Sequence, residues 1–305
     1  MLFQKAKRQA LAESLSATTE AVIEGRSPWA DARRRFLKNK AAVVSLVVLL
    51  VIGVLIVVGP WVLPHAFDDT DMDAMNFAPT LHGFHLFGTD DLGRDLLVRT
   101  LIGGRISFMV GILGTVVSVV IGVSWGAVAG FFGGKIDALM MRFVDVMYAL
   151  PFMLFAILLM TFFGRDLVLM FVALGAISWL DMARIVRGQT LSLKSKEFVE
   201  AAHAIGVSRR LIIFRHIVPN LLGIVVVYAT VTIPNVILTE SVLSFLGMGV
   251  QEPMTSWGVL VDEGQSKMET MPWLLLIPGF MLSLTLYCAN YVGDGLRDAL
   301  DPKDR

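Results

Sequence analysis

Long uncharged apolar runs constrain this chain more than any other feature of its sequence. A helix that crosses the hydrocarbon core of a bilayer needs about 20 apolar residues. Five runs reach or approach that length: Ala41–Phe67, Ile106–Gly134, Val146–Gly164, His216–Thr239 and Thr270–Gly293. Only 17% of the residues are charged, and the mean hydropathy is +0.70, as expected for an integral membrane protein. The runs predict membrane-spanning α-helices, because a helix satisfies its backbone polar groups without water.

A sixth segment, Leu167–Leu180, has only 14 uncharged residues, so it is either a short span or a buried or re-entrant segment. The distribution of Lys and Arg favours a span. With six spans and a cytoplasmic N-terminus, 21 of these cations lie inside and 5 outside, whereas five spans place 12 inside and 14 outside. Because cytoplasmic loops carry an excess of Lys and Arg, we predict an all-α integral membrane fold with six transmembrane helices and cytoplasmic N- and C-termini.

The segment before the first span argues against a secretory signal peptide. The apolar run begins only at Ala41, is too long for the apolar region of a signal, and follows the basic stretch Asp31–Lys40. This stretch is expected to hold its flank in the cytoplasm. Residues 1–28 are polar, and either a short helix on the membrane surface or partial disorder fits their composition.

Two predicted outer loops, His65–Arg105 and Leu243–Glu269, are long enough to meet a partner. The aspartates of the first loop are Asp68, Asp69, Asp71, Asp73, Asp90, Asp91 and Asp95. This loop lacks the glycine turn and the terminal Glu of an EF-hand. We therefore expect a solvated surface that faces a partner, and no metal site. Cys288 is the only cysteine, so no disulfide framework or cysteine-based metal site is expected either.

A polar segment between the fourth and fifth predicted spans has the pattern of two short helices. Residues Glu197–Ala202 are helix formers, and their two alanines leave a small surface that lets another backbone approach. Gly206 suits a left-handed helix end. Ser208 suits the N-cap of a second helix, which we expect to run to about Ile217 and to stop at Pro219. The alternative is an ordinary amphipathic loop helix beside anionic lipid headgroups. The cations of this polar segment are Arg209, Arg210 and Arg215.

The segment Glu200–Pro219 resembles the EAA loop of ABC-importer permeases, the cytoplasmic loop that an ATPase binds. From about Trp29 to the C-terminus the chain resembles the C-type permease subunit of dipeptide/oligopeptide ABC importers, and its oligopeptide branch most of all. The matching motifs are Phe87–Asp95, Gly103–Ser107, Gly130–Asp137, Leu150–Pro151, Leu243–Gly249 and Gly293–Lys303. His216 departs from the aliphatic residue of many permeases, although the peptide branch commonly has His there.

The resemblance implies a type I ABC importer permease of the bacterial inner membrane that translocates peptides, most of all oligopeptides. The five-helix core would comprise residues 106–293, with the coupling loop at 188–219. Residues 1–40 and 294–305 would be cytoplasmic, and residues 41–105 would form the first helix and an outer loop. ATPase coupling would involve Glu200, Ala201, Ala202, Gly206, Arg209, His216 and Pro219. A related permease subunit, two P-loop ATPases and an extracytoplasmic peptide-binding protein would complete the transporter within the lipid.

The chain has no P-loop of its own, since Gly133-Gly134-Lys135 continues with Ile136 rather than Ser or Thr. We therefore expect ATP and Mg²⁺ to bind to the ATPase subunits. In this chain we expect no catalytic residue, cofactor or nucleic-acid partner. Dipeptides or nickel chelates are alternative solutes, because one fold serves many substrates. An intramembrane protease is disfavoured, since neither His-Glu-x-x-His nor Gly-x-Gly-Asp occurs.

Prolines, an acid and glycines within the spans are candidates for the solute path and for helix packing. Pro151 and Pro234 interrupt helical hydrogen bonding and, with Glu240, are candidates for pathway or gating positions. The second span carries glycines four residues apart, which predict close helix contact. These glycines are Gly122, Gly126 and Gly130, preceded by Gly111 and Gly114.

Three acids lie at the predicted span ends: Asp145, Asp181 and Glu240. Acids at such depth are functional candidates by default. A proton relay through them would make the chain a secondary transporter, which is the main rival class. We expect instead that water or a nearby arginine, Arg142 or Arg184, solvates all three.

Overall fold

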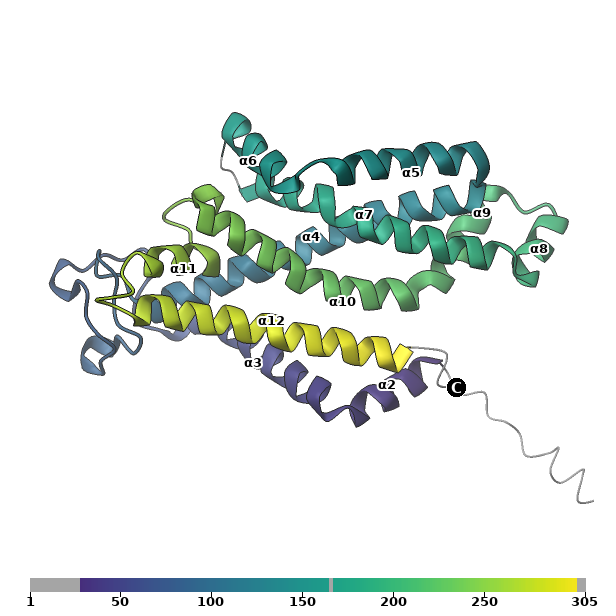
Figure 1. Cartoon of the computed structure of the whole chain (residues 1–305). Coiled ribbons are helices and arrows are strands. Elements are labelled where there is room, and N and C mark those ends of the chain that lie inside the picture. The colour runs from purple at the N-terminus through teal and green to yellow at the C-terminus, as the bar shows by residue number, and fades with distance from the viewer. Residues whose placement is uncertain (1–27, 165–166, 301–305) are drawn as a thin grey trace, which may run out of the picture.

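The computed structural model describes residues 28–164 and 167–300, so the expectation for residues 1–27 lies outside the described residues. Figure 1 shows an elongated bundle in which most helices follow one long axis. The helices are α2 Pro28–Lys38, α3 Lys40–Val62, α4 Leu96–Phe132, α5 Gly134–Ala149, α6 Phe152–Phe163, α7 Leu167–Lys194, α8 Glu197–Ala204, α9 Arg209–Ile212, α10 Val218–Leu243, α11 Trp257–Gln265 and α12 Trp273–Leu300. Among the described residues, β-pairing is limited to one isolated bridge between Thr89 and Asp95.

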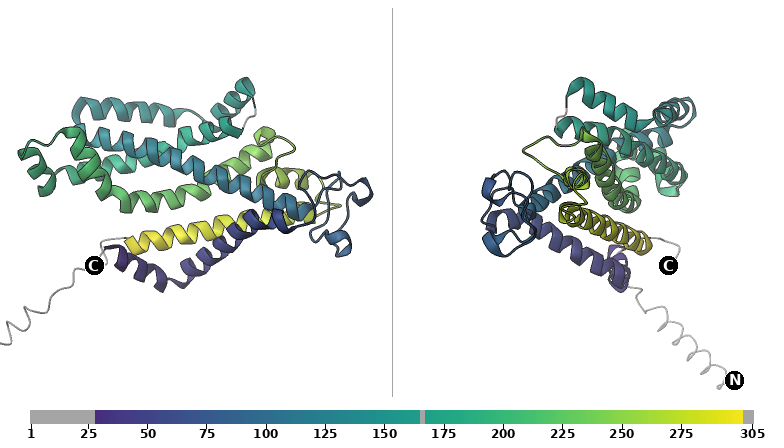
Figure 2. Two further views of the ribbon diagram at one scale, coloured as in Figure 1. Left: turned by 180° about the vertical axis from the view of Figure 1, so that it is seen from behind. Right: turned by 60° about the vertical axis from the view of Figure 1, so that its left-hand side comes forward.

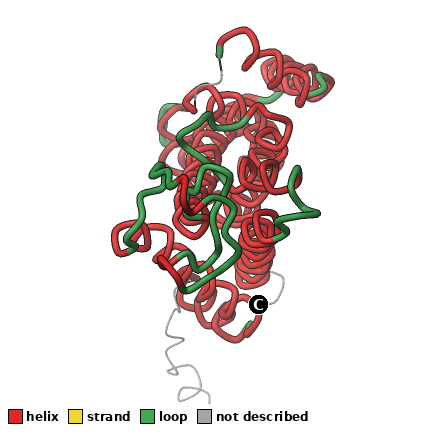
Figure 3. Tube along the Cα trace, turned by 90° about the vertical axis from the view of Figure 1, so that its left-hand side faces the viewer, coloured by secondary structure: helices red, strands yellow, loops and turns green. Residues whose placement is uncertain are grey.

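The bundle has two distinct ends. The loop of residues 63–95 and α11 lie at one end, which we call the outer end after its predicted side (Figure 1). Figure 3 looks onto this end, where the loops cross over the helix ends. The opposite, inner end carries α2, α8, α9 and the end of α12. Apart from the break between α5 and α6, most polar loops and short helices thus lie at the two ends of the bundle.

Several helices are long and apolar enough to cross a membrane. Within the described residues these are α3, α4, the continuous unit Arg209–Met248 that contains α10, and α12. A fifth span is added if α5 and α6 form one broken span. The predicted short span Leu167–Leu180 lies within α7, a helix of 28 residues that extends well beyond it. The described helices therefore give four or five spans by length and composition.

The predicted span Val146–Gly164 is wrong as one continuous helix. The chain leaves the helix after Ala149, and α5 and α6 meet at a bend of 78°. The cause is local, because Pro151 has no backbone N–H and disfavours helical backbone at the residue before it. Leu150 accordingly adopts an extended conformation, with φ −76° and ψ 130°. The expectation that Pro151 interrupts a helix is confirmed.

Helices α4 and α7 lie along each other at the centre of the bundle, as Figures 1 and 2 both show. Glycines of α4 make this approach possible. A Cβ on Gly122 would lie 2.5 Å from Met182 Cβ, and one on Gly126 would lie 2.4 Å from the carbonyl oxygen of Ala183. Neither position has room for a methyl group. The predicted close contact through the α4 glycines is confirmed.

Helices α2, α3 and α12 form one side of the bundle, away from α5 and α6 (Figure 2). Helix α3 packs on α12 and α4. Its other faces are apolar and exposed, with Val44, Leu50 and Val54 among the exposed side chains. At the inner end Ala42 of α3 fits against Gly295 of α12, where a Cβ on the glycine would lie 2.4 Å away. Helix α3 is thus attached along one stripe and leaves a broad apolar surface.

Candidate functional site

The loop at the inner end contains the two short helices that its sequence predicts. Helix α8 ends at Ala204, and Gly206 follows with φ +81°, a left-handed conformation that favours glycine. The N–H of Gly206 donates to the His203 carbonyl, and the N–H of Val207 donates to the Ala202 carbonyl, both at 3.0 Å. These two bonds form a Schellman motif. The prediction for Gly206 is confirmed.

One face of α8 is anchored and the other is free. Val199 and Ala202 are buried in a cluster with Phe131 of α4 and Ile217. Glu200 and Ala201 are exposed. The expectation that both alanines form an accessible surface is therefore wrong for Ala202, because the helical repeat of about 3.6 residues turns it toward the bundle. Of these two alanines, Ala201 stays exposed and can be approached by another backbone.

The inner loop also carries exposed apolar side chains, which the sequence reasoning missed. They are Phe198 and Ile205 in and after α8, and Leu211 and Phe214 in and after α9. Arg209, which was predicted for coupling, is exposed beside them. His216 is half-buried at the start of the long helix that follows. The inner loop thus exposes both apolar and charged side chains.

Pro219 does not end the second helix, contrary to prediction. Helix α9 passes through a π-helical turn, Ile213–Ile217, into α10, and Arg209–Met248 forms one continuous unit. Pro219 lies in the first turn of α10. A missing N–H is tolerated in that turn, and the preceding N–H, that of Val218, donates to the Ile213 carbonyl. The inner loop is therefore joined to the long helix without a break.

Glu240 lies near the other end of this long helix and is fully buried. Its carboxylate accepts hydrogen bonds from Ser107 Oγ of α4 at 3.2 Å and from Ser244 Oγ at 2.6 Å. Among the ion pairs of the described residues none involves Glu240. The expectation that water or an arginine solvates this acid is wrong, because serine hydroxyls satisfy it instead. Pro234, also predicted for the pathway, is buried within α10.

The serines around Glu240 connect three helices. Ser107 Oγ of α4 also accepts the backbone N–H of Trp257 at 3.3 Å, and Ser256 Oγ donates to Ser244 Oγ at 3.3 Å. Trp257 itself is buried, and its indole N–H donates to the Thr100 carbonyl at 2.9 Å. The carboxylate thus lies at the junction of α4, α10 and α11 near the outer end.

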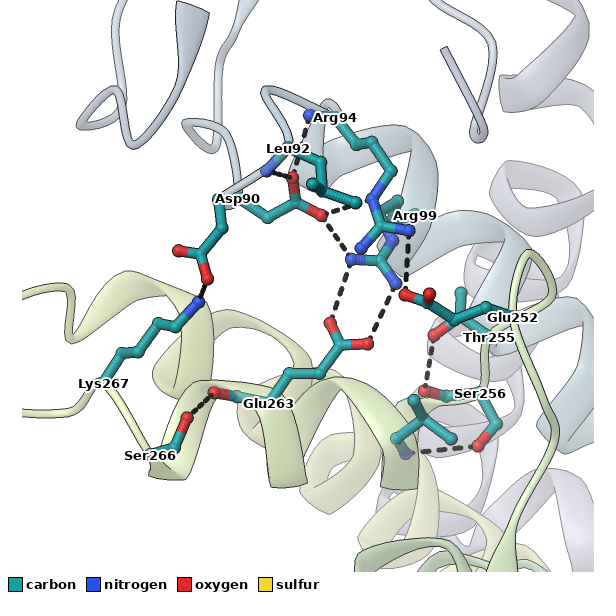
Figure 4. A network of polar contacts seen from close by, with 12 residues as sticks. Asp90, Leu92, Arg94, Arg99, Glu252, Thr255, Ser256, Glu263, Ser266 and Lys267 are labelled. Atoms are coloured by element: carbon teal, nitrogen blue, oxygen red, sulfur yellow. Dashed lines mark hydrogen bonds and ion pairs between the residues drawn. The ribbon is translucent and has the colours of Figure 1, made fainter. Parts of the chain in front are cut away.

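A second polar cluster at the outer end is a network of ion pairs around three buried side chains, those of Asp90, Arg94 and Arg99 (Figure 4). Asp90 accepts from Arg94 Nε at 2.7 Å and from Arg99 Nη1 at 2.5 Å. Arg99 also binds Glu263 of α11 with two nitrogens, at 2.9 and 3.1 Å. Arg94 Nη1 donates to Glu252 at 3.0 Å. The network borders a cavity of about 280 Å³. It ties the first outer loop, the start of α4 and the last outer loop to one another.

The charge on Arg94 follows from its surroundings. Burial opposes ionisation, but hydrogen bonds and Coulombic attraction from Asp90 and Glu252 outweigh it and raise the pKa of the Arg94 guanidinium. The expectation that the aspartates of this loop form a solvated surface is accordingly wrong for Asp90 and for Asp95, which are both buried. Asp95 caps α4 by accepting the N–H of Val98 at 2.9 Å.

Three side chains of the first outer loop have the donor types of a metal site. His65, His85 and Asp95 place one ligand atom each within 4.8 Å of the others. Their present contacts are those of a packed structural cluster: the two rings stack with centroids 4.5 Å apart, and His85 Nδ1 lies 2.9 Å from Asp95. His65 Nε2 lies 2.7 Å from the carbonyl oxygen of Gly83. The absence of a metal remains a prediction.

A third polar cluster lies beside the break between α5 and α6. Arg184 Nη2 donates to Asp145 at 2.8 Å, so the predicted pairing of Asp145 with an arginine is confirmed for Arg184. The Tyr148 hydroxyl donates to Asp181, and the Arg184 guanidinium lies 3.9 Å from the centre of the Tyr148 ring. This mid-bundle cluster therefore joins α5 to α7 around the end of α5.

The apolar helices, the enclosed polar groups and the anchored inner loop together define a helical membrane permease. The chain belongs to the family described as binding-protein-dependent transport system inner membrane component, which matches residues 122–305. Residues 27–79 match the N-terminal transmembrane domain of oligopeptide transport permease C. The chain is thus a transport permease component, and its family is one of inner-membrane proteins.

Curated relatives agree over nearly the whole chain. The chain is 60% identical to the oligopeptide transport system permease protein OppC of Haemophilus influenzae, over 94% of this chain and 92% of that protein. It is 56% identical to OppC of Escherichia coli K12 over the full length of both chains. It is 45% identical to the dipeptide transport system permease protein DppC of Bacillus subtilis, over 90% of this chain and 86% of that protein.

A solved structure shows the same fold. An inward-facing form of the MetNI methionine ABC transporter matches with a TM-score of 0.54, over 68% of this chain and 96% of that chain. The two sequences are 18% identical. This likeness shows a shared fold and nothing beyond the fold.

Proposed function

We propose that this chain is a pore-forming subunit of an ATP-driven importer that translocates peptides, most of all oligopeptides, into the cytoplasm. Relatives at 56–60% identity that are described as oligopeptide transport permeases support this proposal. In the proposed arrangement the chain has six spans in the bacterial inner membrane, with both termini in the cytoplasm. A related permease subunit, two P-loop ATPases and an extracytoplasmic peptide-binding protein complete the transporter. ATP and Mg²⁺ are bound by the ATPases.

The geometry of the inner loop is the single structural observation that carries the coupling mechanism. Its buried face, with Val199 and Ala202, holds α8 on the bundle, while Glu200 and Ala201 are exposed. A partner that binds this free face therefore binds a helix, α8, that is packed firmly on the permease. Because α9 continues through Pro219 into α10, a displacement of the loop reaches the helix that carries Pro234 and Glu240. ATPase closure is proposed to move the pore helices by this route.

The substrate is tested by uptake of labelled di- to pentapeptides in a strain that lacks this chain, with and without a complementing copy. Loss of the longer peptides, restored by the copy, supports an oligopeptide permease. Loss of dipeptide uptake alone supports the dipeptide alternative, for which the 45% identical dipeptide permease DppC is the relevant relative. If every peptide is still imported, other solutes such as nickel chelates become the next candidates. Uptake that stops with ATP depletion and survives a protonophore rejects a proton-coupled secondary transporter.

The coupling role is tested by exchanging Gly206 for Val. A β-branched residue is strained at φ +81°, so the turn after α8 changes shape and uptake falls while the protein still inserts. Gly53→Val in α3 is the matched control, because a Cβ at Gly53 meets no atom within 4 Å and the residue lies outside the coupling loop. Uptake that is unaltered in Gly206→Val contradicts the coupling role of this turn.

A further inference from the structure

Helix α2 is fixed to the inner end of the bundle along one face. Ala32 and Phe36 are buried in a cluster with Ala42 of α3 and Ala299 of α12. A Cβ on Gly295 of α12 would lie 3.3 Å from the Phe36 ring, so the ring fits closely over that glycine. The position of α2 against the two long helices is therefore set by packing.

A break at one residue separates α2 from the first long helix. The N–H of Asn39 donates to the Phe36 carbonyl at 3.0 Å, and the side-chain oxygen of Asn39 accepts the N–H of Ala42 at 3.2 Å. These bonds end α2 and begin α3, and Figures 1 and 2 show that the two helices meet at an angle. Helix α2 is therefore a separate element at the inner end of α3 and not an extension of it.

The face of α2 opposite its buried side interleaves apolar and basic side chains. Trp29 and Leu37 are 55% and 57% exposed. Arg33, which is exposed as well, lies midway between them, because residues four apart share one side of a helix. Arg34 and Lys38, also four apart, form an exposed basic stripe beside them. This pattern is typical of a helix in the membrane–water interface, where Trp lies at the level of the headgroups and cations attract anionic lipid.

The positive charge of α2 is not balanced within the described part of the chain. Residues 28–40 contain five cations and one acid. No ion pair between described residues includes Arg33, Arg34 or Lys38. A cluster of about four to eight cations directly beside a membrane span attracts anionic lipid headgroups.

The adjoining surface of α3 adds an apolar stripe to this basic end. Lys40 is exposed in the first turn of α3, and three valines follow it on the same side at intervals of three or four residues. These valines, each more than half exposed, are Val44, Val47 and Val51. A phospholipid joins an anionic phosphate to two acyl chains, so it matches the basic end and the apolar stripe together. A soluble anion or an acidic protein surface matches only the charges.

We propose that α2 and the start of α3 form a binding surface for an anionic phospholipid of the inner leaflet, such as phosphatidylglycerol. Arg33, Arg34 and Lys38 bind the phosphate. Trp29 and Leu37 lie among the headgroups, and the acyl chains lie along the valines of α3. The proposal uses the membrane topology proposed above, but it does not depend on which solute is carried.

The first test measures lipid selectivity by native mass spectrometry. The purified full chain is titrated in detergent with phosphatidylglycerol and with phosphatidylcholine of the same acyl chains. Arg33→Gln/Arg34→Gln is expected to bind phosphatidylglycerol about 25-fold more weakly than the wild-type chain, from the loss of two contacts to the headgroup. Binding of phosphatidylcholine is expected to stay the same, which also shows that the variant is folded.

The control removes the same charge from the opposite side of the bundle. Lys135→Gln/Arg142→Gln changes two exposed cations of α5 and is expected to leave binding of phosphatidylglycerol unchanged. An equal loss in this control means diffuse attraction to any inner cation, and it overturns the proposal. Equal binding of the two lipids by the wild-type chain overturns it as well.

The second test locates α2 in the assembled transporter, reconstituted in vesicles. Cys288 is the only cysteine and is buried, so a Cys288→Ala background gives a chain without thiols. A fluorophore on Leu37→Cys is expected to be quenched by a phospholipid that carries a nitroxide on its headgroup. A fluorophore on Lys196→Cys, at an exposed position before α8, is expected to be quenched far less. An unquenched Leu37→Cys means that water or a partner protein covers this face, and it overturns the proposal.

The lipid surface and peptide import can fail separately, because neither lipid test uses a peptide. If no peptide is imported while phosphatidylglycerol binds selectively through Arg33 and Arg34, then the solute proposal fails alone. If peptides are imported while Arg33→Gln/Arg34→Gln binds phosphatidylglycerol as the wild-type chain does, then the lipid surface fails alone.

Discussion

Exchanging Arg99 for Met removes the central cation of the outer ion-pair network. Its side chain is only 1% exposed and binds Asp90 and Glu263 at once. Loss of one partner of a buried ion pair costs about 3–5 kcal/mol. Asp90 keeps Arg94 and two backbone N–H donors, and Glu263, which is 33% exposed, returns to water. We therefore expect a loss near the lower limit, about 3 kcal/mol of unfolding free energy.

The assay is thermal unfolding of the purified chain in lipid nanodiscs, followed by tryptophan fluorescence, because Trp257 lies buried at the outer end. Lys267→Met is the control, since the Lys267–Asp91 pair is 29% and 47% exposed and is worth at most about 1 kcal/mol. A double-mutant cycle with Glu263→Gln is expected to give a coupling energy of about 1–3 kcal/mol. An Arg99→Met variant as stable as Lys267→Met refutes the role of the network.

Two further substitutions test the contact between α4 and α7 and the hydroxyl network around Glu240. Gly126→Ala is expected to lower the free energy of unfolding by about 3 kcal/mol, because the new methyl group meets the Ala183 carbonyl. Gly188→Ala, where a methyl group meets no atom, is expected to raise it by about 0.5–1 kcal/mol. Size-exclusion profiles after heating distinguish the two variants, and equal stability contradicts the close contact. Glu240→Ala leaves buried serine hydroxyls without their acceptor and is expected to cost about 2–3 kcal/mol, against less than about 1.5 kcal/mol for Glu240→Gln. Similar unfolding midpoints for the two Glu240 variants contradict the hydroxyl network.

Local chemistry made part of this structure predictable. Uncharged runs locate the long helices, since a helix within lipid needs apolar side chains along its whole length. The requirement of Gly206 for a left-handed backbone and the small size of Gly122 and Gly126 act within a few ångströms of the residue itself. The bend at Leu150 follows directly from the proline after it.

Other features depend on partners that are far away in sequence. Arg99 meets Glu263 across 164 positions, and Ser107 meets Glu240 across 133. No local pattern encodes these contacts, which is why Asp90 of the acid-rich loop and Glu240 were wrongly expected to be solvated. Pro219 was predicted to stop a helix, but a proline has the same sequence signature in the first turn of the next one. Only the π-helical turn before it, visible in the structure, decides between the two.

Helix α4 is continuous over 37 residues and so about 55 Å long. Its first turn is fixed by the Asp95 cap and the Arg99 ion pairs, and its last turns fit against α7 at glycines that leave no slack. Because α4 is one unbroken helix with contacts at both ends, a tilt at one end is passed on to the other. A tilt of about 5° about one end displaces the other by about 5 Å, close to one helical turn. A displacement at one end of α4 is therefore expected to reach the other end, because the helix is continuous between them.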